Sequence, residues 1–246
     1  KSGAAVPASR RTQAVMSARF ALYFAPVRGS LLARFGAAWL GRDAESGAPL
    51  APPAVPGFDP ARLAALTEAP RHYGFHGTLK PPFQLADGSD AAELRAALAV
   101  FAARQAAFTI PQLALRQIGD FLAFVPAHEV PALARLADAC VSEFESFRAP
   151  PAATELARRQ AAGLTPRQSA LLARWGYPYV MEEFRFHLTL TGPVPEAPER
   201  NRLAAALAPL AAPVLAEAVP VQELCLFQQA DRAAPFRLTD RFAFAA

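Results

Sequence analysis

Residues 184–192 read FRFHLTLTG, and polar and apolar side chains alternate along this stretch. Successive side chains of a β-strand point to opposite faces of its sheet. A strand at this place therefore has one apolar face that can be buried in a core and one polar face that can line a cleft. The polar face carries Arg185, His187, Thr189 and Thr191.

An earlier stretch, YGFHGTLK at residues 73–80, shows the same alternation. Its polar face carries His76, Thr78 and Lys80, and its large apolar side chains point the other way. A proline follows each stretch within a few residues. The tetrapeptides HGTL and HLTL are therefore two copies of one motif on two predicted strands, which indicates an internal duplication.

The elements predicted after the two motifs follow in the same order, namely strand, helix, strand, strand. For the first copy they are residues 73–83, 89–104, 108–117 and 121–125, and for the second copy 184–191, 199–207, 217–229 and 236–244. This repeated order predicts a bilobal, duplicated α+β fold. Two antiparallel sheets with flanking helices are expected to face each other across a central cleft.

Residues 16–246 are expected to form a single bilobal domain. The first motif lobe is expected at about 60–127, a helical insertion at about 128–178 and the second motif lobe at about 183–246. Residues 1–15 are polar and carry two arginines, so we expect a disordered extension or an expression remnant there, with Met16 as the natural start.

Two imidazoles that face each other across a cleft are suited to the cleavage of a phosphodiester. A neutral ring can take a proton from the attacking hydroxyl or water, and a protonated ring can give a proton to the leaving oxygen. The reference pKa of histidine is about 6.5, so both states are accessible near neutral pH. We therefore predict that His76 and His187 are catalytic; the sequence leaves open which of them is the base.

Hydroxyl and cationic side chains on the same strand faces can hold the phosphate. Thr78 and Thr189 are predicted to donate hydrogen bonds to its non-bridging oxygens. Lys80 and Arg185 are expected to offset the negative charge on those oxygens. Two further candidates for contact with the substrate are Thr191 and Tyr23.

Two parts of the chain allow two interpretations each. Tyr23 belongs to a strand predicted at residues 19–25, and its ring either lines the pocket or packs with the hydroxyl at the rim. The helical segment at residues 144–175 is either a lid over the cleft or a packing unit, and we favour the packing unit.

The two motifs resemble those of the 2H phosphoesterase superfamily, which has two H-x-[ST]-h motifs on a duplicated two-lobed α+β scaffold. The resemblance implies that both histidines are catalytic, that both threonines bind phosphate and that no metal or other cofactor is required. Members act on 2′,3′-cyclic nucleotides, on cyclic phosphates of ADP-ribose or on RNA ends, as phosphodiesterases or as ligases.

Further segments resemble a bacterial subgroup of this superfamily that is associated with phosphonate-metabolism operons. They are ALYFAP at 21–26, FGAAWLGRD at 35–43 and the two motif stretches. This resemblance implies a ribose cyclic phosphate or a related intermediate as the substrate.

Three other functions use the same residues. The cleft could belong to a module that binds a nucleotide or an RNA end without turnover, or to an enzyme similar to RNA 2′,5′-ligases. A pure binder does not need two titratable groups, which favours an enzyme. A metallohydrolase is disfavoured because Asp, Glu or Cys ligands near the histidines are missing from the sequence.

The composition fits a cytoplasmic enzyme that acts on a small phosphorylated substrate. The net charge of +4 is too small to argue for a nucleic-acid-binding protein, and no basic stretch is interleaved with aromatic residues. Nucleic acid is therefore disfavoured as a partner but left open, no membrane partner is expected, and we expect a monomer. Cys140 and Cys225 stand in apolar stretches and are expected to be buried.

Overall fold

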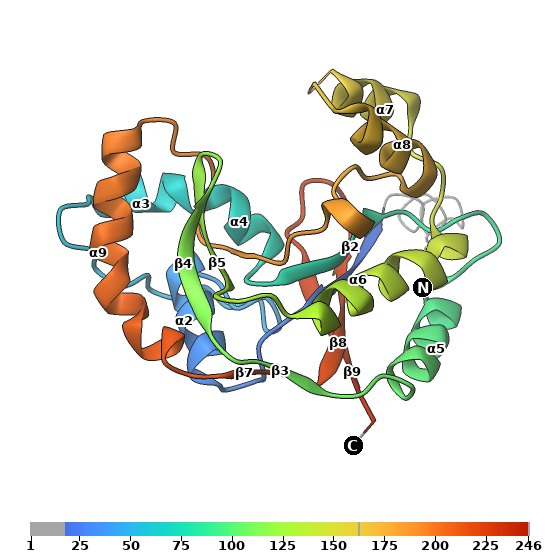
Figure 1. Cartoon of the computed structure of the whole chain (residues 1–246), viewed down its shortest axis with the longest axis horizontal. Coiled ribbons are helices and arrows are strands. Elements are labelled where there is room, and N and C mark those ends of the chain that lie inside the picture. Colours follow the sequence, from blue (N-terminus) through green and yellow to red (C-terminus); the bar gives the residue numbers. More distant parts are fainter. Residues whose placement is uncertain (1–17, 162, 246) are drawn as a thin grey trace, which may run out of the picture.

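The computed structural model describes residues 18–161 and 163–245 of the chain (Figure 1). The extension predicted at residues 1–15 and the start predicted at Met16 lie outside them. The strands are β1 (Arg19–Phe24), β2 (Gly77–Phe83), β3 (Phe108–Ile110), β4 (Leu113–Ile118), β5 (Phe121–Pro126), β6 (Leu188–Thr189), β7 (Val219–Val221), β8 (Glu223–Gln229) and β9 (Arg237–Ala243). The helices are α2 (Leu31–Leu40), α3 (Pro60–Leu66), α4 (Glu68–Tyr73), α5 (Ala91–Ala102), α6 (Pro131–Glu143), α7 (Ala153–Gln160), α8 (Pro166–Trp175) and α9 (Ala197–Leu215), with short 3₁₀ turns at Glu145–Phe147 and Met181–Glu183. The predicted α+β class is confirmed.

The motif strands β2 and β6 are neighbours in the middle of the main sheet. Within the described residues this sheet has seven strands in the order β4-β5-β6-β2-β1-β8-β9, and the neighbours pair antiparallel. β2 and β6 meet through the pairing of Gly77 with Leu188. The strands β4, β5 and β6 and the strands β2, β1, β8 and β9 therefore form one continuous sheet instead of the two expected sheets. The two motifs lie side by side in it.

Each motif strand belongs to a set of strands that includes a hairpin from the other copy. β2 lies beside β1, which pairs with the C-terminal hairpin of β8 and β9, and β6 lies beside the hairpin of β4 and β5. The chain crosses between the halves at β3 and again at β7, and these two crossing segments pair with each other (Figure 1). This exchange differs from the lobes expected at 60–127 and 183–246, because local patterns predict strands but not their partners.

Both motif strands are shorter than the alternation predicts. Tyr73 is the last residue of α4, and Gly74 ends that helix with a positive φ of 83°. The second strand contains Leu188 and Thr189 alone. Its ladder stops there because the amides of Leu190 and Thr191 both donate to the carbonyl of Leu122 instead of continuing the regular register.

Gly77 allows the two motifs to approach each other closely. A Cβ atom at this position would lie 2.4 Å from the Phe186 ring, closer than packed atoms allow. The buried side chains of Leu79, Phe186 and Leu188 belong to the main core on the apolar side of the motifs. Truncating Leu188 to alanine would cost about 2–5 kcal/mol of stability. Gly77 therefore serves the packing of the core.

The helical segment after α6 divides into two parts with different surroundings. On α8, Leu171 packs in a small apolar cluster with Val141 and Val180, as expected of a packing unit. The helix α7 instead forms part of the wall of the cavity described below. Cys140 and Cys225 are buried free thiols, as expected. Among the described helices, none is both long and apolar enough to cross a membrane.

Candidate active site

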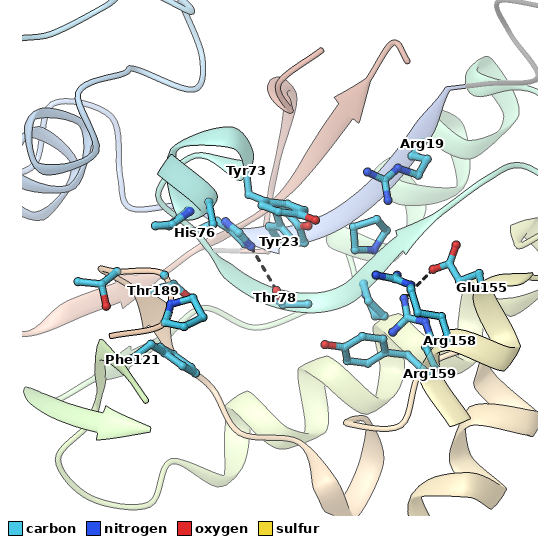
Figure 2. A pocket seen from close by; sticks show the side chains of 18 residues that line it. Arg19, Tyr23, Tyr73, His76, Thr78, Phe121, Glu155, Arg158, Arg159 and Thr189 are labelled. Atoms are coloured by element: carbon cyan, nitrogen blue, oxygen red, sulfur yellow. Dashed lines mark hydrogen bonds and ion pairs between the residues drawn. The ribbon is translucent and has the colours of Figure 1, made fainter. Parts of the chain in front are cut away.

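A cavity of about 450 Å³ lies beside the motif strands, within the size range of small-molecule sites (Figure 2). Its walls come from β1, β2, α4, the start of β5, α7 and the segment that begins at β6. Figure 2 shows Thr189 and Phe121 at one side, His76, Thr78, Tyr23 and Tyr73 in the middle, and Arg19, Arg158 and Arg159 at the other side. Residues far apart in the sequence therefore share one solvent space.

The imidazole of His76 is held on both of its nitrogens. Nδ1 lies 2.8 Å from the carbonyl oxygen of Gly74, and Nε2 lies 3.2 Å from Oγ1 of Thr78. The carbonyl can only accept, so Nδ1 carries the proton, and in the neutral ring Nε2 accepts a hydrogen bond from the Thr78 hydroxyl. The pKa of His76 is lowered to about 4, mainly by burial and in smaller part by the nearby His187, while the hydrogen bond to the Gly74 carbonyl acts in the opposite direction. The ring is therefore neutral at pH 7.

Tyr23 stacks on the His76 ring. The ring centroids are 3.7 Å apart and the planes differ by 16°. Tyr23 is buried, and burial raises the pKa of its hydroxyl well above the usual value. Tyr23 thus lines the cavity, and its ring orients His76 and excludes water from one of its faces.

His187 has the same anchor as His76. Its Nδ1 lies 2.8 Å from the carbonyl oxygen of Arg185, again two residues back in the chain. Its ring packs against Phe121, with centroids 5.7 Å apart, and Phe121 lines the cavity although His187 itself does not. Burial also lowers the pKa of His187. In both copies, therefore, Nδ1 is bound to the backbone, whereas Nε2 contacts the Thr78 hydroxyl in His76 and has no hydrogen bond among the described residues in His187.

The two threonines of the motifs line the cavity, as their positions on the polar face predict. Thr78 and Thr189 are half-buried and belong to adjacent strands of the sheet. Both residues belong to the cavity wall, from which a bound phosphate can be reached. The structure thus brings together His76, Thr78 and Thr189, with His187 beside them.

Lys80 does not line the cavity. Its side chain is 1% exposed, and Nζ donates to the carbonyl of Val141 at 2.9 Å and pairs with Glu145 at 3.0 Å. The prediction from alternation is wrong here because the register with β1 shifts, so that Tyr23 pairs with Thr78 and Leu22 with Lys80. The extra residue of this β-bulge, Leu79, turns Lys80 away from the face of Thr78.

The structure places the Arg185 side chain outside the cavity and Thr191 on the cavity wall. The Arg185 side chain is exposed and lines a separate hollow next to His128, and it is the Arg185 carbonyl that serves the site, by anchoring His187. Thr191 touches the cavity wall, but it is 1% exposed and its Oγ1 accepts a hydrogen bond from the amide of Leu122 at 3.0 Å. This bond fixes the end of β6.

The donor set around the two histidines lacks further metal ligands. Within residues 18–161 and 163–245, no three His, Cys, Asp or Glu side chains are grouped so that they could hold a metal ion. Among the residues that the structure describes, the cavity wall contains one carboxylate, Glu155 on α7, which Figure 2 shows on the side of the arginines.

A protein family described as "Protein of unknown function (DUF1045)" matches residues 78–237. The chain belongs to the DUF1045 family. The match starts within the first motif and includes the second one, so both threonines lie inside it. In its two motifs, and in the paired His and Thr side chains, this DUF1045 chain resembles the 2H phosphoesterases.

Two relatives of this DUF1045 chain are named ribose 1,5-bisphosphate phosphokinase PhnN. The protein of Janthinobacterium sp. (strain Marseille) is 44% identical over 173 residues, which cover 70% of this chain and 38% of the relative. The protein of Laribacter hongkongensis (strain HLHK9) is 37% identical over 221 residues, which cover 89% of this chain and 50% of the relative. The chain thus spans half or less of the length of each relative.

Solved structures similar to this DUF1045 chain include E. coli LigT complexed with 3′-AMP. The TM-score is 0.44 and the identity 17%, over 94% of this chain and 99% of LigT. A structure described as a phosphoesterase has a TM-score of 0.43 and 16% identity, over 93% of this chain and 99% of that one.

Sequence reasoning missed the cationic side of the cavity. Arg19 belongs to β1, and Arg158 and Arg159 belong to α7. The charged residues of α7 match the pattern of an ordinary solvated helix face, so the sequence offers no sign that this face meets a cavity. The pair of adjacent arginines is the one signal that could have indicated an anion site.

Proposed function

We propose that this chain is a metal-independent phosphoesterase that hydrolyses a cyclic or diester phosphate of a small ribose- or nucleotide-type compound. The observation that carries this proposal is the repeated arrangement of the two histidines. Each ring is anchored through Nδ1 to the carbonyl two residues before it, and each motif has a threonine on the cavity wall. Acid–base catalysis needs two such oriented imidazoles.

His76 is proposed as the general base. Because burial keeps its pKa at about 4, the ring is neutral at pH 7 and its Nε2 has a free lone pair once the Thr78 hydroxyl turns to the substrate. Nε2 takes a proton from a water molecule as the water oxygen attacks phosphorus. The bond between phosphorus and one sugar oxygen breaks as the new bond forms.

His187 is proposed as the general acid. Its ring has no stacked tyrosine, and it carries no hydroxyl contact on Nε2 among the described residues. The negative charge of a bound phosphate raises the pKa of a nearby imidazole, so His187 can enter the reaction protonated. It gives its proton to the leaving sugar oxygen, and the products are a phosphate monoester and a free hydroxyl.

Thr78 and Thr189 are proposed to hold the non-bridging phosphate oxygens. Their hydroxyls can donate to the oxygens on which negative charge grows during attack. The two threonines belong to adjacent strands and to one cavity wall, which supports a phosphate site shared by both.

The names of the relatives bear on the substrate. We propose a ribose cyclic phosphate, because ribose 1,5-bisphosphate is a phosphate monoester that hydrolysis of a cyclic ester of ribose can supply. A place in phosphonate metabolism would follow. We do not propose the kinase activity in those names for this chain, since it contains no G-x-x-x-x-G-K-[ST] phosphate-binding loop and corresponds to only part of each relative.

The proposal is tested by assaying the purified chain in EDTA against a panel of cyclic phosphates. The panel contains 2′,3′-cyclic nucleotides, ADP-ribose 1″,2″-cyclic phosphate and ribose 1,2-cyclic phosphate with and without a 5-phosphate. Turnover that survives EDTA supports the proposal and identifies the substrate class. Absence of turnover on every compound, with binding retained, would favour a module that binds nucleotides or RNA ends, and joining of RNA ends would favour an activity similar to RNA 2′,5′-ligases.

A further inference from the structure

The cavity continues past His76 to a second side that the proposed chemistry does not use. Arg19, Arg158 and Arg159 line it there, and Tyr177, whose ring lies under the Arg159 guanidinium, belongs to the same cavity wall. Figure 2 shows these arginines across the cavity from Thr189 and Phe121, with Tyr23 and Tyr73 between. Catalysis at the motifs leaves this cationic side without a role.

The positive charge at this side is only partly balanced. Glu155 is the one carboxylate among the described residues of the cavity wall, and it pairs both with Arg159 at 2.8 Å and with Arg232 at 3.3 Å. Arg19 bonds to Gln229 at 2.7 Å, and its guanidinium lies 5.2 Å from the centre of the Phe236 ring, so neither of its contacts is anionic. The wall therefore has an excess of positive charge.

Arg158 is the arginine with the most capacity for a ligand. It is exposed, and no hydrogen bond or ion pair holds its guanidinium within the described part of the chain. Its neighbour Arg159 is fixed by Glu155 and lies 4.8 Å from the centre of the Tyr177 ring. The cluster thus combines a fixed guanidinium with a free one, and guanidinium groups match the geometry of phosphate oxygens.

We infer that the side of the cavity formed by Arg19, Arg158 and Arg159 binds a second phosphate group of the substrate, away from the phosphate that is cleaved. This inference rests on the proposed function. It narrows the substrate to a compound with a phosphate monoester at one end and a cyclic phosphate at the other. A 5-phosphorylated ribose 1,2-cyclic phosphate has this pattern, and opening its ring at the 2-oxygen leaves ribose 1,5-bisphosphate, the compound in the relatives' name.

The first test compares kcat/KM for ribose 1,2-cyclic phosphate with and without the 5-phosphate. We expect the wild type to prefer the 5-phosphorylated compound by tenfold or more, and Arg158→Ala to reduce this preference by about tenfold, the scale of one charge-assisted hydrogen bond. Arg158→Lys should retain part of the preference, because it keeps the charge but loses the fork of donors. Arg135→Ala, at an exposed arginine of α6 outside the cavity, should leave the preference unchanged. Equal turnover of the two compounds, or an equal preference in Arg158→Ala and Arg135→Ala, would overturn the inference.

The second test needs no turnover and separates this inference from the proposed function. Binding of ribose 5-phosphate to the His187→Ala chain is measured by calorimetry. We expect a further Arg158→Ala change to weaken binding by about tenfold, and Thr78→Val with Thr189→Val to weaken it by less than about threefold. The opposite ranking, or no binding, would overturn the inference. Binding that depends on Arg158, together with no turnover of any cyclic phosphate, would instead refute the proposed hydrolysis.

Discussion

The two copies of the motif have the same backbone anchor but different surroundings. His76 is enclosed between Tyr23 and Thr78, and burial lowers its pKa to about 4. His187 lies against Phe121 at the side of the cavity and has no stacked tyrosine. Duplication thus explains how both rings are oriented, whereas the unequal neighbours explain how one can act as the base and the other as the acid.

The largest expected effect comes from removing either imidazole. His76→Ala and His187→Ala should each lower kcat/KM for the cyclic phosphate that is turned over by about a hundredfold or more, the scale of losing a general acid or base. The exposed His128, outside the cavity, provides the control, and His128→Ala should retain full activity. Loss of activity in only one of the two motif variants would contradict a catalytic role for both histidines.

The threonines should differ in a way that follows from their neighbours. Thr189→Val should lower kcat/KM by about tenfold, because one hydrogen bond to the phosphate is lost. Thr78→Val should lower it more, since Thr78 also bonds to Nε2 of His76. Steady-state kinetics on the two variants check this order, and an equal or reversed order would show that the contact with His76 has no part in catalysis.

Tyr23 should affect the pH profile more than the rate. Tyr23→Leu removes the stacked ring and admits water to His76, so the pKa of His76 should rise from about 4 toward 6.5. A base must be neutral, so the acid limb of the profile of kcat/KM should move to higher pH, with a loss of no more than about 1.3-fold at pH 7 from this shift. Tyr23→Phe keeps the ring and should keep the profile. An acid limb that stays in place in Tyr23→Leu would contradict the role given to this stack.

The same pKa shift predicts a small effect on stability. The unfolded chain binds a proton on His76 near pH 6.5 and the folded chain near pH 4, so the free energy of unfolding should fall as the pH is lowered through this window. Because His76 is half-buried, its protonation should lower the free energy of unfolding by about 1–2 kcal/mol across this window. Urea unfolding at pH 7 and pH 4.5 should therefore show a smaller loss for His76→Gln than for the wild type and for His128→Gln.

The sequence was sufficient to predict the motif residues and most elements. Strict alternation identified the faces of His76, Thr78 and Thr189, and the predicted helix at residues 89–104 agrees with α5 (Ala91–Ala102). The α+β class followed from the repeated order of elements. These features depend on local periodicity, which a single sequence contains.

Features that depend on strand partners could not be predicted in this way. The bulge at Leu79 breaks the alternation and turns Lys80 into the core. The local sequence pattern does not predict this bulge. The helix α9 was expected to end near Leu207, but it continues through Pro209 and Pro213. Its buried face, which includes Ala211 and Val214, offsets the hydrogen bonds that the prolines remove.

The central claim is tested most directly by changing the leaving group of the substrate. A ribose phosphodiester with a p-nitrophenyl group expels a weakly basic oxygen that needs no general acid. With EDTA present, His76→Ala should lose activity on this compound and on the cyclic phosphate alike, whereas His187→Ala should recover on it to within about tenfold of the wild type. Equal losses in the two variants on both compounds would contradict the assignment of base and acid, and full activity in both variants would refute the two-histidine mechanism.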